Sequence, residues 1–155
     1  MKVLVAYDSV STSKMTMKVA QTIAEALRGK GVDVDLLSVG DVDKSAVKNY
    51  GFLIAGGPTM AFRPSRGIAQ FLDSLPRGDF NGKKGSAFDT QVQSAVSGNA
   101  SKGIEKKLES LGFVIFKEPL VVYVKGAGKN SYEFKDGELE KAKNWAEEAA
   151  KSISV

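Results

Sequence analysis

The sequence predicts an α/β fold in which a parallel β-sheet carries helices on both faces. Short apolar runs alternate along the chain with segments whose apolar residues recur at helical spacing. Strict alternation is typical of parallel sheets, because the chain must cross the sheet between neighbouring parallel strands. The 155 residues contain no internal repeat, low-complexity tract or linker. We therefore expect a single domain over residues 1–155, with five strands and about four helices.

The first half of the chain contains three of the expected strands. Residues 2–7 (KVLVAY) form a short apolar run bounded by turn residues, and residues 50–57 (YGFLIAGG) have the apolar content of a buried central strand. Residues 32–39 (VDVDLLSV) alternate apolar and polar positions, as a strand near an edge would. Between residues 2–7 and 32–39, apolar residues at helical spacing predict a helix over residues 15–28. Gly29 and Gly31 end this helix.

The second half adds two strands and the remaining helices. Residues 83–88 form the fourth expected strand, and residues 113–124 the fifth, interrupted near Pro119 because proline cannot donate within a central ladder. Residues 125–131 (KGAGKNS) superficially suggest a nucleotide-binding loop, but they lack its G-x-x-x-x-G-K-[ST] spacing and predict an ordinary Gly-rich turn. Further helices are expected over residues 65–75, 97–111 and 136–153.

Composition excludes several kinds of chemistry. The chain has no Cys and no His, which excludes disulfides, thiolate nucleophiles, Cys/His zinc sites and His acid–base catalysis. The net charge of +4 is interleaved, without a basic run or an aromatic RNA-binding signature, so we expect no nucleic-acid partner and only a weak preference for an acidic partner or an anionic ligand. No apolar run approaches the about 20 residues that span a bilayer, and no signal peptide is evident. We expect a cytoplasmic protein with no membrane association.

The loops that follow the first, third and fourth strands are the expected site. In open parallel sheets, ligands bind beyond the carboxyl ends of the strands, where the strand order reverses. These loops cover residues 8–16, 56–66 and 89–98.

The first loop has the composition of an anion-binding site. Hydroxyl side chains precede a helix start, whose free N–H groups and partial positive charge favour an anion, and Lys14 adds a full charge. A Ser/Thr N-cap on an ordinary helix is the alternative explanation. The candidate residues are Ser9, Ser11, Thr12, Ser13, Lys14, Met15 and Thr16.

The same loop resembles the phosphate loop of the flavodoxin family, S-x-T-G-N-T. Ser11, Ser13 and Thr16 fall on the hydroxyl positions of that motif. Lys14 stands where the family has Gly, and Met15 stands where it has Asn. Either the charge of Lys14 compensates for the absence of the glycine in binding the phosphate, or its side chain clashes where the backbone should approach the phosphate.

Two further segments carry the resemblance. Gly56–Pro76 is similar to G-S-P-T-[YH]-x-G-R-P-S…FL, which lies beside the flavin ring in this family. The resemblance implies a tight turn at residues 57–59 whose amides reach the ring edge, with Met60 or Phe62 covering a ring face; the alternative is that both side chains fill core gaps. The candidate residues of this segment are Pro58, Thr59, Met60, Ala61 and Phe62.

The third segment, Ala87–Phe113, resembles a branch in which F-D-T follows the fourth strand. The resemblance implies that Asp89, Thr90 and Gln91 contact polar atoms of the flavin. A carboxylate near the ring disfavours an anionic reduced flavin, so we expect Asp89 to lower the flavin potential. The alternative is that Asp89 is a turn residue that satisfies nearby N–H groups.

Over the whole chain, the resemblance implies a flavodoxin-like three-layer sandwich with a five-stranded sheet of order 2-1-3-4-5. It also implies an FMN-binding electron carrier that exchanges electrons with a reductase and an acceptor protein. Two other functions stay open: a flavin-dependent reductase of a quinone-type acceptor on the same fold, and a module for regulation or protein interaction that binds no flavin.

Overall fold

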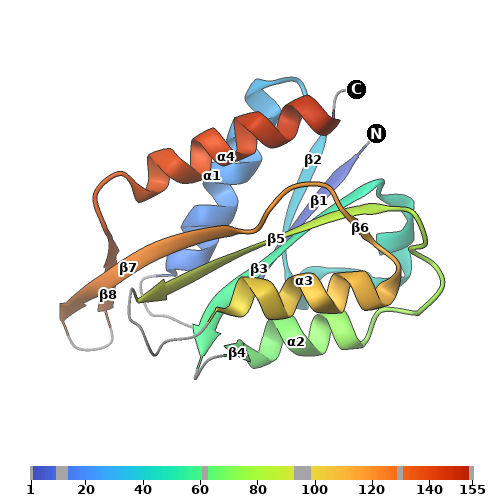
Figure 1. Cartoon of the computed structure of the whole chain (residues 1–155), viewed down its shortest axis with the longest axis horizontal. Helices are drawn as coiled ribbons and strands as arrows, with labels where there is room; N and C mark the ends of the chain where they lie inside the picture. The colour runs from blue at the N-terminus through green and yellow to red at the C-terminus, as the bar shows by residue number, and fades with distance from the viewer. Residues whose placement is uncertain (1, 10–13, 61–62, 93–98, 129–130, 154–155) are drawn as a thin grey trace.

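Five parallel strands form the centre of the sheet, in the order β2-β1-β3-β5-β7 (Figure 1). Their bounds are Val3–Tyr7 for β1, Val34–Ser38 for β2, Phe52–Met60 for β3, Lys84–Val92 for β5 and Leu120–Gly128 for β7. The computed structural model describes residues 2–9, 14–60, 63–92, 99–128 and 131–153. The predicted order 2-1-3-4-5 is confirmed for these five parallel strands, with β5 and β7 as the fourth and fifth predicted strands, but one more strand follows β7 in the sheet. The alternating segment 32–39 lies at the edge of the sheet, as β2.

Three short strands extend this sheet, so the predicted count of five is too low for the described residues. β4 (Arg63–Pro64) pairs antiparallel with β3, and β8 (Ser131–Phe134) pairs antiparallel with β7. β6 (Val114–Ile115) pairs with β5 and is separated from β7 by a break that includes Pro119. The predicted interruption at Pro119 is confirmed. The predicted turn at residues 125–131 is wrong for most of its length, because β7 continues to Gly128 and forms a hairpin with β8.

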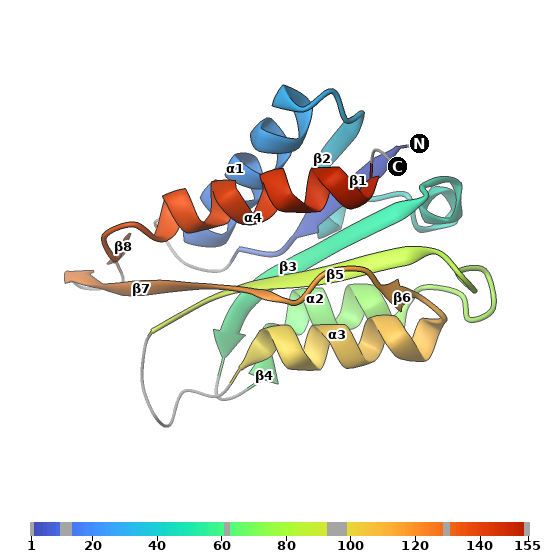
Figure 2. The ribbon, with the colours of Figure 1, turned by 45° about the horizontal axis from the view of Figure 1, so that its top comes forward.

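Two helices cover each face of the sheet (Figure 1, Figure 2). α1 (Met15–Gly29) and α4 (Glu138–Ile153) lie together on one face. α2 (Arg66–Asp73) and α3 (Ala100–Leu111) lie on the other. The four predicted helices are thus confirmed. Two 3₁₀ helices, η1 (Val39–Asp41) and η2 (Lys44–Asn49), join β2 to β3, and the sequence did not predict them.

The alternation of side chains along each strand divides the core into two apolar layers. Val3 and Val5 of β1 pack in the layer under α1 and α4. Leu4 and Ala6 of the same strand pack in the layer under α2 and α3. Because both faces are covered, these strands read as continuous apolar runs rather than as alternating ones. No helix in the described part of the chain is long and apolar enough to cross a bilayer.

This architecture brings the candidate residues to one end of the sheet. The carboxyl ends of β1, β3 and β5 point the same way, and α1, α2 and α3 begin there (Figure 2).

Candidate functional site

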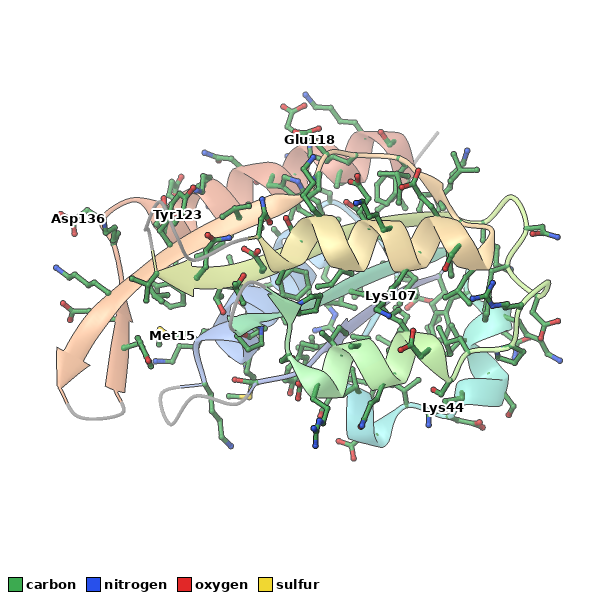
Figure 3. All side chains as sticks on the ribbon, turned by 60° about the horizontal axis from the view of Figure 1, so that its bottom comes forward. Met15, Lys44, Lys107, Glu118, Tyr123 and Asp136 are labelled. Atoms are coloured by element: carbon green, nitrogen blue, oxygen red, sulfur yellow. The ribbon has the colours of Figure 1, made fainter. Side chains whose placement is uncertain are left out.

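The structure describes two thirds of the predicted site residues. Figure 3 shows Met15 at the end of the molecule toward which β5 and β7 point. The remaining predicted residues, Ser11, Thr12, Ser13, Ala61 and Phe62, lie outside the described residues, as does the side chain of Met60.

Lys14 begins α1 in an unusual conformation. Its φ of 52° and ψ of 47° lie in the left-handed region, which favours glycine, and no other non-glycine residue in the described part of the chain has a positive φ. Lys14 is the N-cap residue and its side chain makes no capping hydrogen bond, so the alternative of a plain Ser/Thr cap is wrong. Lys14 thus adopts the backbone conformation expected of the glycine that it replaces in the family motif.

Ser9 presents an unsatisfied hydroxyl at the other end of the first loop. Its Oγ is buried and has no hydrogen-bond partner among the described residues. A buried hydroxyl without a partner costs about 1–3 kcal/mol, so an unpaired one at a loop is typical of a ligand-binding position. The described parts of the first loop therefore hold a buried hydroxyl without a described partner at Ser9 and a cationic helix start at Lys14.

The residues expected in the third loop belong to β5, because that strand continues to Val92 rather than ending at residue 88. Thr90 points toward α1, and its Oγ1 lies 2.8 Å from Oγ1 of Thr16 in a buried hydrogen bond. Asp89 and Gln91 are on the opposite side of the strand. All three side chains are buried, with exposed fractions of 8% or less.

We expect the Thr16–Thr90 hydrogen bond to stabilise the start of α1 against the sheet. Thr90→Val leaves the buried hydroxyl of Thr16 without its partner and should lower the free energy of unfolding by about 1–3 kcal/mol. Thr16→Val/Thr90→Val removes both hydroxyls and should cost less than the sum of the two single changes. Urea unfolding of the four proteins measures the coupling, and additive costs would contradict it.

Asp89 lies at the centre of a buried polar cluster. Its side chain has no exposed surface, and its Oδ2 accepts hydrogen bonds from the Ser101 N–H (3.0 Å), Gln91 Nε2 (3.0 Å) and Thr59 Oγ1 (3.2 Å). Thr59 Oγ1 also accepts from the Ala100 N–H (3.0 Å), so the cluster joins β3, β5 and the first turn of α3. The alternative explanation that Asp89 is a turn residue satisfying nearby N–H groups is confirmed for the N–H of Ser101 and wrong for the turn, because Asp89 lies in β5.

Burial governs the charge of Asp89. It raises the pKa of this carboxyl to about 6, although the hydrogen bonds from Ser101, Gln91 and Thr59 act in the opposite direction. The second oxygen, Oδ1, has no partner among the described residues. Asp89 is therefore a carboxyl that exchanges a proton near neutral pH at the carboxyl end of β5.

The predicted tight turn at residues 57–59 is wrong. These residues continue β3, in which Gly57 pairs with Asp89 and Pro58 with Thr90. β4 runs antiparallel to β3, so the chain has reversed direction by Arg63. The Ser65 N–H then donates to the Pro58 carbonyl (3.1 Å), which holds the start of α2 against β3.

Asp8 and Ser65 form a contact that the sequence did not predict. Asp8 directly follows β1, and its Oδ2 accepts a hydrogen bond from Ser65 Oγ (2.6 Å) at the N-cap of α2. The carboxylate lies so close to Gly67 that any side chain there would overlap it. A carboxylate at a helix start is favourable because it offsets the positive end of the helix dipole. The acidic residue directly after the first strand was therefore the sequence signal for this contact. Its partner lies 57 residues away, and the sequence contains no local pattern that links the two.

Comparisons with known proteins agree with this geometry. The family model described as Flavodoxin matches residues 5–151. A flavodoxin from Maridesulfovibrio salexigens is 32% identical over 126 residues, an alignment that covers 78% of this chain and 85% of that protein. A solved structure of a flavodoxin from the domain Archaea has a TM-score of 0.79 at 23% identity, with both chains fully covered. The rubredoxin oxygen:oxidoreductase of Desulfovibrio gigas has a TM-score of 0.75 at 26% identity over 99% of this chain and 36% of that one.

Proposed function

The chain belongs to the flavodoxin family, and we propose that FMN, which this family binds for electron transfer, lies at the carboxyl ends of β1, β3 and β5. The hydroxyl of Ser9 carries this proposal, since a buried donor that has no partner among the described residues, at the loop between β1 and α1, suits a phosphate. The left-handed backbone of Lys14 also supports the proposal, because the phosphate-loop motif of the family has glycine at this position and glycine favours that conformation. The residues present therefore fit FMN.

Each group of residues has a distinct role in this proposal. The first loop, with Ser9, Ser11, Thr12, Ser13 and Lys14, binds the phosphate at the start of α1. Met15 and Thr16 hold that helix start beside it, because both side chains are buried and the Thr16 hydroxyl bonds to Thr90. The β3–β4 segment, with Pro58, Thr59, Met60, Ala61 and Phe62, borders the ring. Asp89, Thr90 and Gln91 are buried, so they hold the surrounding segments in place and set the charge beneath the site.

When bound, FMN supplies the capacity to accept and release electrons. The chain itself holds the phosphate charge against the N–H groups and the ammonium at the start of α1. The hydrogen bonds of Asp89 to α3 and β3 fix two of the site's elements relative to each other. A negative charge on Asp89 also disfavours adding electrons to the site, so its protonation state is expected to influence the potential.

The direct test is to titrate the apo-protein with FMN and to monitor binding through the quenching of flavin fluorescence. We expect saturable binding at one FMN per chain, and no uptake at micromolar FMN would contradict the proposal. Turnover of NAD(P)H by the isolated protein would favour a reductase over a carrier that needs a separate reductase and an acceptor protein. Location in the cytoplasm remains a prediction of the sequence.

Replacements of Lys14 separate the effect of its charge from that of its backbone. Both Lys14→Gly and Lys14→Ala remove the ammonium and should weaken FMN binding about fivefold at low salt, equivalent to about 1 kcal/mol. A residue with a side chain is strained in the left-handed conformation, and only Lys14→Gly removes that strain. The free energy of unfolding of Lys14→Gly should therefore exceed that of Lys14→Ala by about 1 kcal/mol. FMN titration and urea unfolding check the two effects, with Lys44→Ala as the control on a distant exposed lysine. Equal stability of the two Lys14 variants would contradict the assigned conformation.

A further inference from the structure

Apart from Asp8, the segments that follow β1, β3 and β5 and begin α1, α2 and α3 lack acidic residues, whereas the acidic residues at this end of the molecule, Glu133, Asp136, Glu138 and Glu140, lie in β8 and around the start of α4. None of the chain's 18 Asp and Glu residues lies in residues 9–24, 59–72 or 90–104. The same segments contain five cationic residues, Lys14, Lys18, Arg63, Arg66 and Lys102. The net charge of +4 is therefore unevenly distributed over the chain.

Three of these cations form a surface that we call the basic rim: Lys18, Arg66 and Lys102. Lys18 lies in the first turn of α1, Arg66 is the first residue of α2, and Lys102 lies in the first turn of α3. All three side chains are exposed, and none forms an ion pair with a carboxylate of the described residues. Because α1 covers one face of the sheet and α2 and α3 the other, the three helix starts that carry the rim lie on both sides of the carboxyl ends of β3 and β5 (Figure 1).

The nearby carboxylates do not neutralise the rim. Asp8 is partly buried and accepts the hydrogen bond of Ser65, and Asp89 has no exposed surface. The rim is therefore a basic patch beside the carboxyl ends of β3 and β5, whereas the exposed carboxylates of Glu133, Asp136 and Glu140 lie in β8 and around the start of α4.

The requirements of folding do not explain the rim. A cation in the first turn of a helix opposes the helix dipole and costs about 0.3–1 kcal/mol at an exposed position. The first turns of α1, α2 and α3 contain no acidic residue, whereas α4 begins with Glu138 and Glu140. Three helix starts thus carry the unfavourable sign at the site end. Bound FMN does not account for it either, because one phosphate carries at most about two negative charges and Lys14 already lies at that position.

We propose that the basic rim is the docking surface for an acidic redox protein. The inference rests on the proposed function, because it places the partner at the end of the molecule through which electrons would enter and leave. Complementary charge steers association and raises encounter rates by about 10- to 1,000-fold at low salt. A nucleic acid is a poorer match, because the three cations are spread over three helices whose described first turns contain no exposed aromatic side chain for bases to stack on.

The test compares two variants of equal charge change. K18E/R66E/K102E reverses the rim, and K44E/K48E/R77E reverses two lysines and one arginine that are also exposed but lie in η2 and after α2. Stopped-flow kinetics measure reduction of each FMN-loaded protein by a reduced acidic [2Fe–2S] ferredoxin between 20 and 300 mM NaCl. The wild-type rate should fall about tenfold with salt. K18E/R66E/K102E should react about tenfold more slowly at 20 mM NaCl and speed up with salt, and K44E/K48E/R77E should stay within about threefold of wild type.

Two further measurements separate this proposal from the proposed function. FMN affinity of K18E/R66E/K102E, measured at 300 mM NaCl, should stay within about threefold of wild type, because the rim excludes the phosphate loop and salt screens its charges from the phosphate. Calorimetry at low salt measures binding of the ferredoxin to the apo-proteins. It therefore tests docking even if the chain takes up no FMN. Equal slowing in both variants, a wild-type rate that does not depend on salt, or tighter binding of a DNA duplex than of the ferredoxin would overturn the proposal.

Discussion

The stability advantage of Asp89→Asn over the wild type is expected to grow by about 1–3 kcal/mol between pH 4 and pH 6.5 and to stay constant above that range. The reason is that burial raises the pKa of Asp89 from 3.8 to about 6. Each unit of such a shift corresponds to about 1.4 kcal/mol of preference for the protonated form.

The sign follows from the protons bound in the two states. Between pH 4 and pH 6 the unfolded chain has lost the Asp89 proton while the folded chain retains it, so the free energy of unfolding falls as the pH rises. Above pH 6 both states are ionised and the full cost of the buried charge remains. The amide introduced by Asp89→Asn would carry no charge at any of these pH values. This variant therefore lacks the Asp89 contribution to the pH dependence.

Urea unfolding of the apo-proteins from pH 4 to pH 8 measures this difference. The lowered pKa values of Asp35, Asp43 and Glu118 produce the opposite slope, but they are common to both proteins and cancel in the comparison. Asp79→Asn, at an exposed position, is the matched control and should parallel the wild type. A difference between Asp89→Asn and wild type that does not vary with pH would show that Asp89 is not the buried proton-binding group.

The flavin potential gives the same residue a second readout. If FMN lies where we propose, Asp89→Asn should raise its midpoint potential at pH 8, where the wild-type carboxylate is ionised, and change it little at pH 5. Potentials that are unchanged at both pH values would remove Asp89 from the factors that set the potential, without affecting the stability argument.

Apolar periodicity predicted the helices and the five main strands because it reports burial directly, whereas the order of the strands came from the resemblance to the flavodoxin family. The same reasoning ended β3 and β5 too early. Thr59, Asp89 and Thr90 are polar yet belong to strands, since their side chains pair with one another or with helix starts. A sequence does not show that two distant polar residues are buried together as partners. Such residues are therefore assigned to loops when only apolar runs are taken as strands.

The candidate site shows the same limit. The loops after the first and third strands could be located from the fold class alone, because parallel strands end together. The left-handed backbone of Lys14 could not, since lysine ordinarily avoids that conformation. The Asp8–Ser65 contact likewise depends on the completed fold, which brings the end of β1 to the start of α2.

Gly56→Ala is expected to lower the free energy of unfolding by about 3 kcal/mol, a large share of the roughly 5–15 kcal/mol typical of a domain. Gly56 of β3 pairs with Phe88 of β5, and both residues are buried. A methyl group on Gly56 would overlap three ring carbons of Phe88. The ring cannot move freely, because it packs in the apolar layer beneath α1 and α4.

A second change distinguishes this overlap from a general intolerance of β3. Phe88→Leu removes the ring and should by itself destabilise the fold by about 1 kcal/mol or more. In the double variant Gly56→Ala/Phe88→Leu the new methyl group has room, so its cost should be smaller than the sum of the single costs by about 1–2 kcal/mol. Gly40→Ala is the control, because no atom lies within 4 Å of the position of its methyl group. Costs that simply add would mean that Gly56 is required for its backbone rather than for the space that Phe88 occupies.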